Sequence, residues 1–138
     1  MGKKVTKEYG DNTYTLAGFR SFIMSGLRDK SSRWAPKTMA KKRAREGKLI
    51  NPKTGRENIA NRCNMCHGRF LEKETIVDHI KPVVPVKKMG DSGTNFLGYD
   101  WNVIIRRLFC EADGLQVICK GCHDIKSKKE NEERRKWN

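Results

Sequence analysis

The sequence lacks long apolar runs, and it contains few acidic side chains and only three histidines. No apolar stretch approaches the roughly 20 residues needed to cross a bilayer, and the N-terminus lacks the apolar core of a secretory signal. Only 36% of the 138 residues are hydrophobic, so the surface available for burial is modest and an additional cross-link would help to stabilise the fold. We therefore expect one small intracellular domain with an appendage, and no membrane-spanning segment.

The shortage of acidic residues leaves a large positive charge. The chain has 30 Lys and Arg against 16 Asp and Glu, which gives a formal net charge of +14. Much of this excess lies between residues 27 and 56, where 11 Lys and Arg are accompanied only by Asp29 and Glu46. Such a concentration of positive charge predicts a polyanionic partner.

Two helices are predicted in the N-terminal half. Over residues 15–29 the apolar side chains recur at three- and four-residue steps, which is typical of one helix face. After Arg33 and Trp34, Pro36 can occupy the first turn of a second, strongly basic helix that runs to about Glu46. Residues 51–55 then contain the Asn, Pro and Gly of a turn.

The C-terminal half is predicted to alternate short strands with helices. Residues 74–80 and 115–118 have the apolar, β-branched composition of strands. The glycines at 90, 93 and 98 indicate an irregular loop, and residues 100–111 show helical spacing of apolar side chains. A polar, charged helix is expected over residues 121–136.

Five cysteines are present, and four of them form two CxxC pairs. Four thiolates satisfy the tetrahedral preference of zinc, and in a reducing cytosol such pairs hold a metal more often than a disulfide. The alternatives are reduced core cysteines or a redox pair. We predict one structural zinc site, and we interpret the fifth cysteine, Cys110, as a small core residue. The predicted zinc ligands are Cys63, Cys66, Cys119 and Cys122.

Two histidines stand next to notable residues. His79 follows Asp78 at the end of the first predicted strand, and His123 follows the last cysteine of the second CxxC pair. The alternative for Asp78 and His79 is a buried hydrogen-bonded pair, and His123 could instead be an uninvolved neighbour or a zinc ligand. His67 is interpreted as a polar cover of the first CxxC turn.

The segment from residue 62 to residue 130 resembles the HNH endonuclease family, in particular its small phage-type members with two CxxC pairs. The resemblance is carried by CNMC at 63–66, IVDHI at 76–80 and GLQVICKGCHDIK at 114–126, and more loosely by RWAPK at 33–37 and NPKTGR at 51–56. It implies an α+β fold with a zinc-stabilised ββα-metal (His-Me finger) catalytic core. Residues 59–138 would form the nuclease domain and residues 1–58 a basic helical DNA-binding extension, in the cytoplasm of an infected bacterial host.

The resemblance also implies a division of chemical roles. His79 would be the general base that activates water for attack on a scissile phosphate. Asp78 and His123 would hold one divalent cation, either Mg²⁺, Mn²⁺ or Ni²⁺, because a carboxylate and an imidazole do not select sharply among these ions. The four cysteines would hold only the structural Zn²⁺.

The sequence departs from the family signature at one position. The middle asparagine, which usually braces the loop that carries the general base or assists with the metal, is replaced here by Gly114. Asp113, Glu111 or Asn102 could substitute for it, and the sequence does not choose among them.

The basic helix is expected to bind double-stranded DNA. Lysine and arginine side chains there would contact phosphates without reading sequence, although the alternative is a solvated charged face. Trp34 could stack on bases or pack in the core. The predicted DNA-binding residues are Arg33, Lys37, Lys41, Lys42, Arg43, Arg45 and, on the last helix, Lys126.

The function that these observations predict is metal-dependent cleavage or nicking of DNA phosphodiesters by a monomer or a dimer. A non-catalytic zinc module that binds nucleic acid is the first alternative. The second is an adaptor that uses its basic arm in a phage packaging or replication complex.

Overall fold

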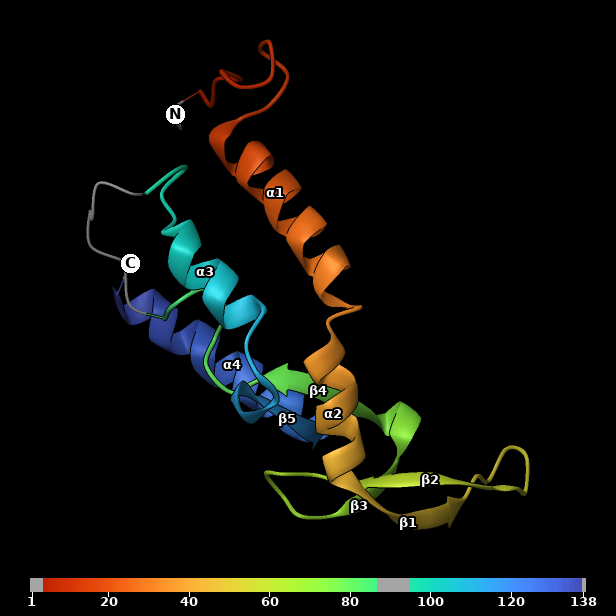
Figure 1. The fold of residues 1–138 in the computed structure, drawn as a ribbon. Helices are drawn as coiled ribbons and strands as arrows, with labels where there is room; N and C mark the ends of the chain where they lie inside the picture. The colour runs from red at the N-terminus through yellow and green to blue at the C-terminus, as the bar shows by residue number, and fades with distance from the viewer. Residues whose placement is uncertain (1–3, 87–94, 138) are drawn as a thin grey trace.

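The computed structural model describes residues 4–86 and 95–137 (Figure 1). These residues form an α+β fold, as predicted, with four α-helices and small antiparallel sheets. The glycines at 90 and 93 of the predicted loop lie outside the described residues. None of the described helices is both long enough and apolar enough to span a bilayer.

The N-terminal half contains the two predicted helices. α1 (Leu16–Ser31) begins where the Thr15 hydroxyl accepts the Gly18 N–H at 3.0 Å, and α2 (Ala35–Ala44) has Pro36 in its first turn. The Trp34 indole donates a hydrogen bond to the Cys110 carbonyl at 2.7 Å, and its ring packs edge-on against Phe109. Of the two roles considered for Trp34, the structure therefore shows the packing one.

A three-stranded antiparallel sheet follows α2, in the order β1 (Arg45–Ile50), β2 (Glu57–Arg62), β3 (Arg69–Leu71). Only the turn between β1 and β2 was predicted from the sequence, and the predicted basic helix ended two residues too late, inside β1. The error has a physical reason. Both strands are mostly polar, so they lack the alternation of apolar and polar residues that marks a half-buried strand.

A second sheet pairs β4 (Thr75–His79) with β5 (Leu115–Cys119), and α4 (Lys120–Trp137) follows β5 without a loop. These elements match the predicted strands and helix to within one or two residues. The register places Asp78 opposite Gln116 and His79 opposite Leu115. Short 3₁₀ turns, Glu72–Glu74 and Ala112–Gly114, precede the two strands.

α3 (Trp101–Leu108) is shorter than its predicted range of 100–111, because the chain leaves the helical conformation at Phe109. It completes a core formed by Met24 of α1, Val83, Ile104 and Leu108. A separate small cluster contains Cys63 and Cys119 of the two CxxC pairs together with the fully buried Ile118.

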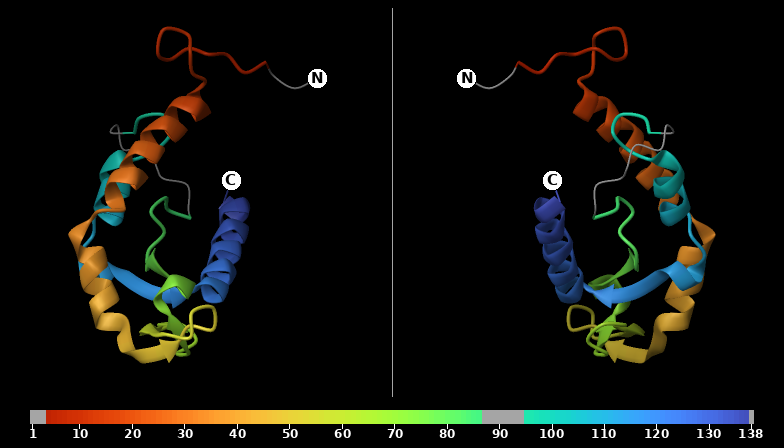
Figure 2. Two further views of the ribbon diagram at one scale, coloured as in Figure 1. Left: turned by 90° about the vertical axis from the view of Figure 1, so that its right-hand side faces the viewer. Right: turned by 90° about the vertical axis from the view of Figure 1, so that its left-hand side faces the viewer.

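The helices flank the β4–β5 pair. Figure 2 shows α1 and α2 on one side of these strands and α4 on the other. α2 contacts β5, so the basic helix is attached directly to the strand that carries Cys119. The expected boundary between an extension and a nuclease domain, after residue 58, falls inside β2.

Candidate functional site

Four cysteines converge at one point, as the two CxxC pairs predicted. The sulfur atoms of Cys63, Cys66, Cys119 and Cys122 all lie within 4.8 Å of one another, and those of Cys66 and Cys119 are 4.0 Å apart. Zinc bound to sulfur at about 2.3 Å in a tetrahedron requires sulfur atoms roughly 3.8 Å apart. All five cysteines of the chain are free thiols. The cluster therefore fits a structural Zn²⁺ site.

The local backbone prepares this cluster for a metal. Cys63 follows β2 directly. Its sulfur accepts hydrogen bonds from the backbone N–H groups of Cys66 and Cys119 at 3.4 and 3.3 Å. Burial alone raises the pKa of the Cys63 thiol, but these N–H donors oppose it and lower that pKa to about 6. Hydrogen bonding with Cys119, together with burial, raises the pKa of Cys122 to about 12. Zinc binding must therefore displace protons from the cluster.

The two oxygen atoms of Asp78 have different surroundings. Oδ2 accepts the Gln116 side-chain amide at 3.0 Å and lies 3.2 Å from the Lys126 ammonium. Oδ1 lies 3.9 Å from Nε2 of His123, which is in the first turn of α4. Only 11% of the Asp78 side chain is exposed. One oxygen is thus fixed by protein donors, and the other is left facing an imidazole nitrogen.

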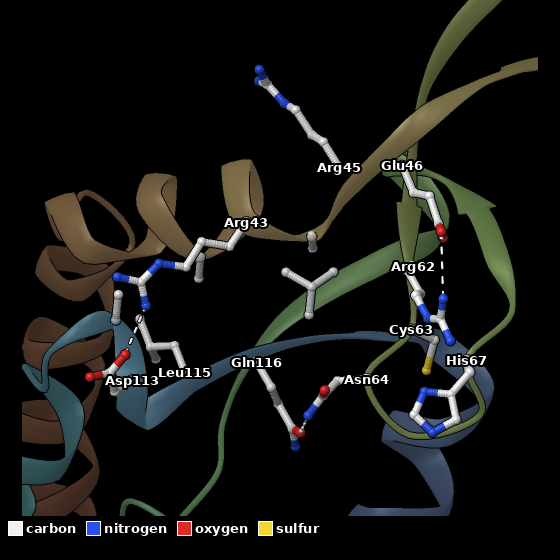
Figure 3. Close-up of a pocket in the computed structure, with 14 residues that line it drawn as sticks. Arg43, Arg45, Glu46, Arg62, Cys63, Asn64, His67, Asp113, Leu115 and Gln116 are labelled. Atoms are coloured by element: carbon white, nitrogen blue, oxygen red, sulfur yellow. Dashed lines mark hydrogen bonds and ion pairs between the residues drawn. The ribbon is translucent and has the colours of Figure 1, made fainter.

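Gln116 connects Asp78 to the first cysteine turn. Its Oε1 accepts the Asn64 side-chain amide at 2.8 Å, and Asn64 lies between Cys63 and Met65. Figure 3 shows this pair of amides beside a pocket of about 450 Å³ between α2, β5 and the cysteine turn. The Asn64 N–H also bonds the Val117 carbonyl at 2.9 Å. The first cysteine turn and the Asp78 carboxylate are therefore linked through two consecutive side-chain hydrogen bonds.

His79 is held by a main-chain carbonyl. Its Nε2 lies 3.0 Å from the Leu108 carbonyl oxygen. Because a carbonyl can only accept, Nε2 carries the proton of the neutral ring, and Nδ1 is left with its lone pair. Burial lowers the pKa of His79, and the nearby positive charges of Lys37 and Arg28 lower it further against the opposing effect of the Leu108 carbonyl.

Asp78, His79 and His123 line one cavity of about 250 Å³, which Arg28 of α1 also lines. Sequence reasoning missed most of the α4 residues in this cavity. They share a helical spacing of three and four residues that starts at His123, and this spacing was the available signal. The missed α4 residues are Ser127, Glu130, Asn131 and Arg134.

The Gly114 backbone forms a hydrogen bond with the residue that follows His79. Its carbonyl accepts the N–H of Ile80 at 3.0 Å. A Cβ atom at this position would lie 2.9 Å from the Cys110 sulfur, so Cys110 occupies the space where a side chain would begin. The proposed substitute Asp113 is 91% exposed and pairs with Arg43 at 2.8 Å, away from the cavity. Neither Glu111 nor Asn102 lines the cavity.

The predicted DNA-binding residues have different environments. Lys41, Lys42 and Arg45 are exposed, while Arg33 pairs with Asp29 and Arg43 with Asp113 at the surface.

Lys37 and Lys126 are partly buried. Burial lowers the pKa of Lys37, as do Arg28 and Lys41. The Lys126 ammonium points inward, where it contacts Asp78, Glu130 and the His79 carbonyl.

No family model, curated protein or solved structure matches this chain. The four-cysteine cluster supports a zinc site, and the comparisons identify no family. A function has therefore to be inferred from the cysteine cluster and from the side chains around Asp78.

The cluster predicts one zinc per chain. Metal analysis of the purified protein should find one equivalent, and the Cys63→Ser/Cys119→Ser variant should lose it together with most of its folded structure, because binding energy at such sites is folding energy. Cys110→Ser is the matched control and should keep the zinc. Zinc retained in the double variant would contradict the assignment.

The contact at Gly114 predicts a coupling with Cys110. Gly114→Asn should lower the free energy of unfolding by about 1–3 kcal/mol, since it forces a Cβ against the sulfur. In the Cys110→Ala background the same change should cost less. Urea denaturation of the two single variants and the double variant measures this coupling. Additive effects would show that Cys110 does not exclude a side chain at residue 114.

Proposed function

We propose that this chain is a metal-dependent DNA endonuclease of the HNH type, which hydrolyses phosphodiester bonds at the cavity lined by Asp78, His79 and His123. The observation that carries the proposal is the convergence of these three side chains on one cavity, beside a four-cysteine cluster. The order of β4, β5 and α4 is the order that a ββα-metal core requires. The resemblance of residues 62–130 to the HNH family supports the same assignment.

Asp78 Oδ1 and His123 Nε2 are the proposed ligands of the catalytic divalent cation. Two donors that bind one Mg²⁺ at about 2.1 Å can lie at most about 4.2 Å apart, and these two atoms are 3.9 Å apart. Gln116 and Lys126 hold the other carboxylate oxygen, so Oδ1 is oriented before an ion arrives. When bound, Mg²⁺, Mn²⁺ or Ni²⁺ would neutralise negative charge that develops at the reacting phosphate.

His79 is the proposed general base. The Leu108 carbonyl fixes its proton on Nε2, which leaves the Nδ1 lone pair to accept a proton from the attacking water. The lowered pKa keeps the ring neutral near pH 7, the form in which it can accept a proton. The carbonyl is a positioning group, because it orients the ring and does not itself contact the substrate.

The positive groups near the cavity are suited to hold the DNA backbone. Arg28 lines the cavity, and its guanidinium has no hydrogen-bond or ion-pair partner within the described parts of the chain, so it is free to bind a phosphate. Lys41, Lys42 and Arg45 extend the positive surface along α2 into β1. Such contacts would position duplex DNA without reading its sequence.

A non-catalytic zinc module that binds nucleic acid is the second candidate. One observation favours it, namely Gly114 in the place of the signature asparagine. The hydrogen bond from Ile80 to the Gly114 carbonyl weakens this objection, because the main chain supplies a brace directly after His79.

A plasmid-cutting assay separates the two candidates. Zinc-loaded protein should nick or linearise supercoiled plasmid in the presence of Mg²⁺, Mn²⁺ or Ni²⁺. His79→Ala should reduce the rate by roughly 10²-fold or more, the usual contribution of a general base, while DNA binding remains.

His67→Asn is the matched control, because His67 is exposed and has a backbone φ of 63°, a conformation that asparagine tolerates. This variant should cut like the wild type. A wild-type protein that binds plasmid but cuts it with none of the three ions would exclude the nuclease and favour the second candidate.

A further inference from the structure

The β1–β2 hairpin, which we define as residues 45–62, extends away from the helices and from the β4–β5 pair (Figure 1). We propose that this hairpin is a second DNA-contacting element, which enters the major groove of duplex DNA outside the cleavage cavity. The proposal takes its partner, duplex DNA, from the proposed function, and it adds an element that the sequence analysis did not predict.

Most of the outer half of the hairpin is exposed to solvent on both faces. From residue 52 to residue 58 every side chain is exposed, and Ile50 opposite Glu57 is 66% exposed. A two-stranded ribbon that is solvated on both faces gains little stability from burial. Its length is therefore better explained by a partner than by the core of this chain.

The base of the hairpin is firmly attached. Ala60 is fully buried opposite Leu71 of β3, and the buried Asn61 side chain donates a hydrogen bond to the Thr75 hydroxyl at 3.1 Å, where β4 begins. Cys63, the first cysteine of the cluster, follows directly. The base of the hairpin is thus bonded to β4, the strand that carries Asp78, and a contact at the hairpin tip can set the position of DNA relative to the cavity.

The tip has a defined conformation. The Asn51 side chain accepts the Lys53 N–H at 3.0 Å, and the Asn51 carbonyl accepts the Gly55 N–H at 2.8 Å. Gly55 has a φ of 71°, which favours glycine, and Asn51 and Arg56 close the turn with a 2.8 Å hydrogen bond. An ordered tip loses less conformational entropy on binding than a flexible loop does.

The charge of the hairpin fits a polyanion. Residues 45–62 contain five basic and two acidic side chains, and one of the acidic ones, Glu46, is paired with Arg62 at 3.5 Å. Lys48, Lys53 and Arg56 make no side-chain hydrogen bond or ion pair within the described residues. Three unpaired cations on a narrow projection are suited to bind phosphates.

The shape of the hairpin favours the major groove. The major groove of B-DNA is about 12 Å wide and admits a two-stranded β-ribbon, whereas the minor groove is about 6 Å wide. Consecutive strand residues point to opposite faces, so Asn58 and the acidic Glu57 lie on opposite sides of the ribbon. The Asn58 side chain, on the face away from Glu57, is an amide that can contact base edges.

Fluorescence anisotropy tests the proposal on the full-length, zinc-loaded chain. The probe is a duplex of about 30 base pairs, titrated at several salt concentrations without added divalent cation, so that binding is measured apart from cutting. Lys53→Ala/Arg56→Ala should bind about tenfold more weakly than the wild type. The slope of log affinity against log salt should become shallower by about 1.8, the value for two lost phosphate contacts.

Lys4→Ala/Lys7→Ala is the matched control. It removes the same charge at the exposed N-terminal segment, far from the hairpin, and it should retain the wild-type salt slope. Dimethyl sulfate, which methylates guanine N7 in the major groove, should reveal protected guanines with the wild type that become reactive with the hairpin variant.

Equal affinities and slopes for the two double variants would overturn the proposal. So would hairpin-dependent binding that is tighter for single-stranded DNA or RNA than for the duplex. These outcomes differ from a failure of the proposed function. A chain that binds duplex through the hairpin but never cuts would exclude only the nuclease, and a chain that cuts with an unaltered hairpin variant would exclude only the groove contact.

Discussion

The four-thiolate cluster is the interaction on which the rest of this structure depends. It joins the end of β2, the end of β5 and the first turn of α4. Cys122 precedes His123, and Asn64 of the first cysteine turn reaches Asp78 through Gln116. Zinc bound here would therefore fix both proposed ligands of the catalytic cation, although it contacts neither. The same cluster adjoins the base of the β1–β2 hairpin. One metal would therefore fix both the proposed catalytic residues and the hairpin proposed to bind DNA.

Features with a local cause could be predicted from the sequence. Threonine at the start of α1 and proline at the start of α2 are common helix beginnings, and apolar spacing marked α1 and α3. The CxxC spacing predicted the cysteine cluster, because tetrahedral coordination needs two close pairs. The strands β4 and β5 were predicted from two short segments of apolar, β-branched composition between the cysteine pairs.

Features that depend on tertiary contacts were missed. The strands of the β1–β2 hairpin are mostly polar and lack an alternation of apolar and polar residues, and the adjacent basic residues favoured a longer helix. The link from Asn64 to Gln116 spans 52 residues, and the sequence has no local signal for it. The sequence has no local signal for the contact of the Lys126 ammonium with Asp78 of β4, and the contact of Lys126 with DNA stays a prediction. The choice of glycine at 114 becomes understandable only when Cys110 is seen beside it.

Binding of Mn²⁺ to the zinc-loaded chain, followed by the electron paramagnetic resonance signal of free Mn²⁺, tests the central claim most directly. The claim is that Asp78 and His123 form a cation site oriented by the cysteine turn. One Mn²⁺ should bind per chain. The site should be lost in Asp78→Asn and His123→Ala and weakened in Gln116→Leu, with the zinc content unchanged in each. Mn²⁺ that binds the Asp78→Asn variant as tightly as the wild type, or that fails to bind the wild type, would contradict the account.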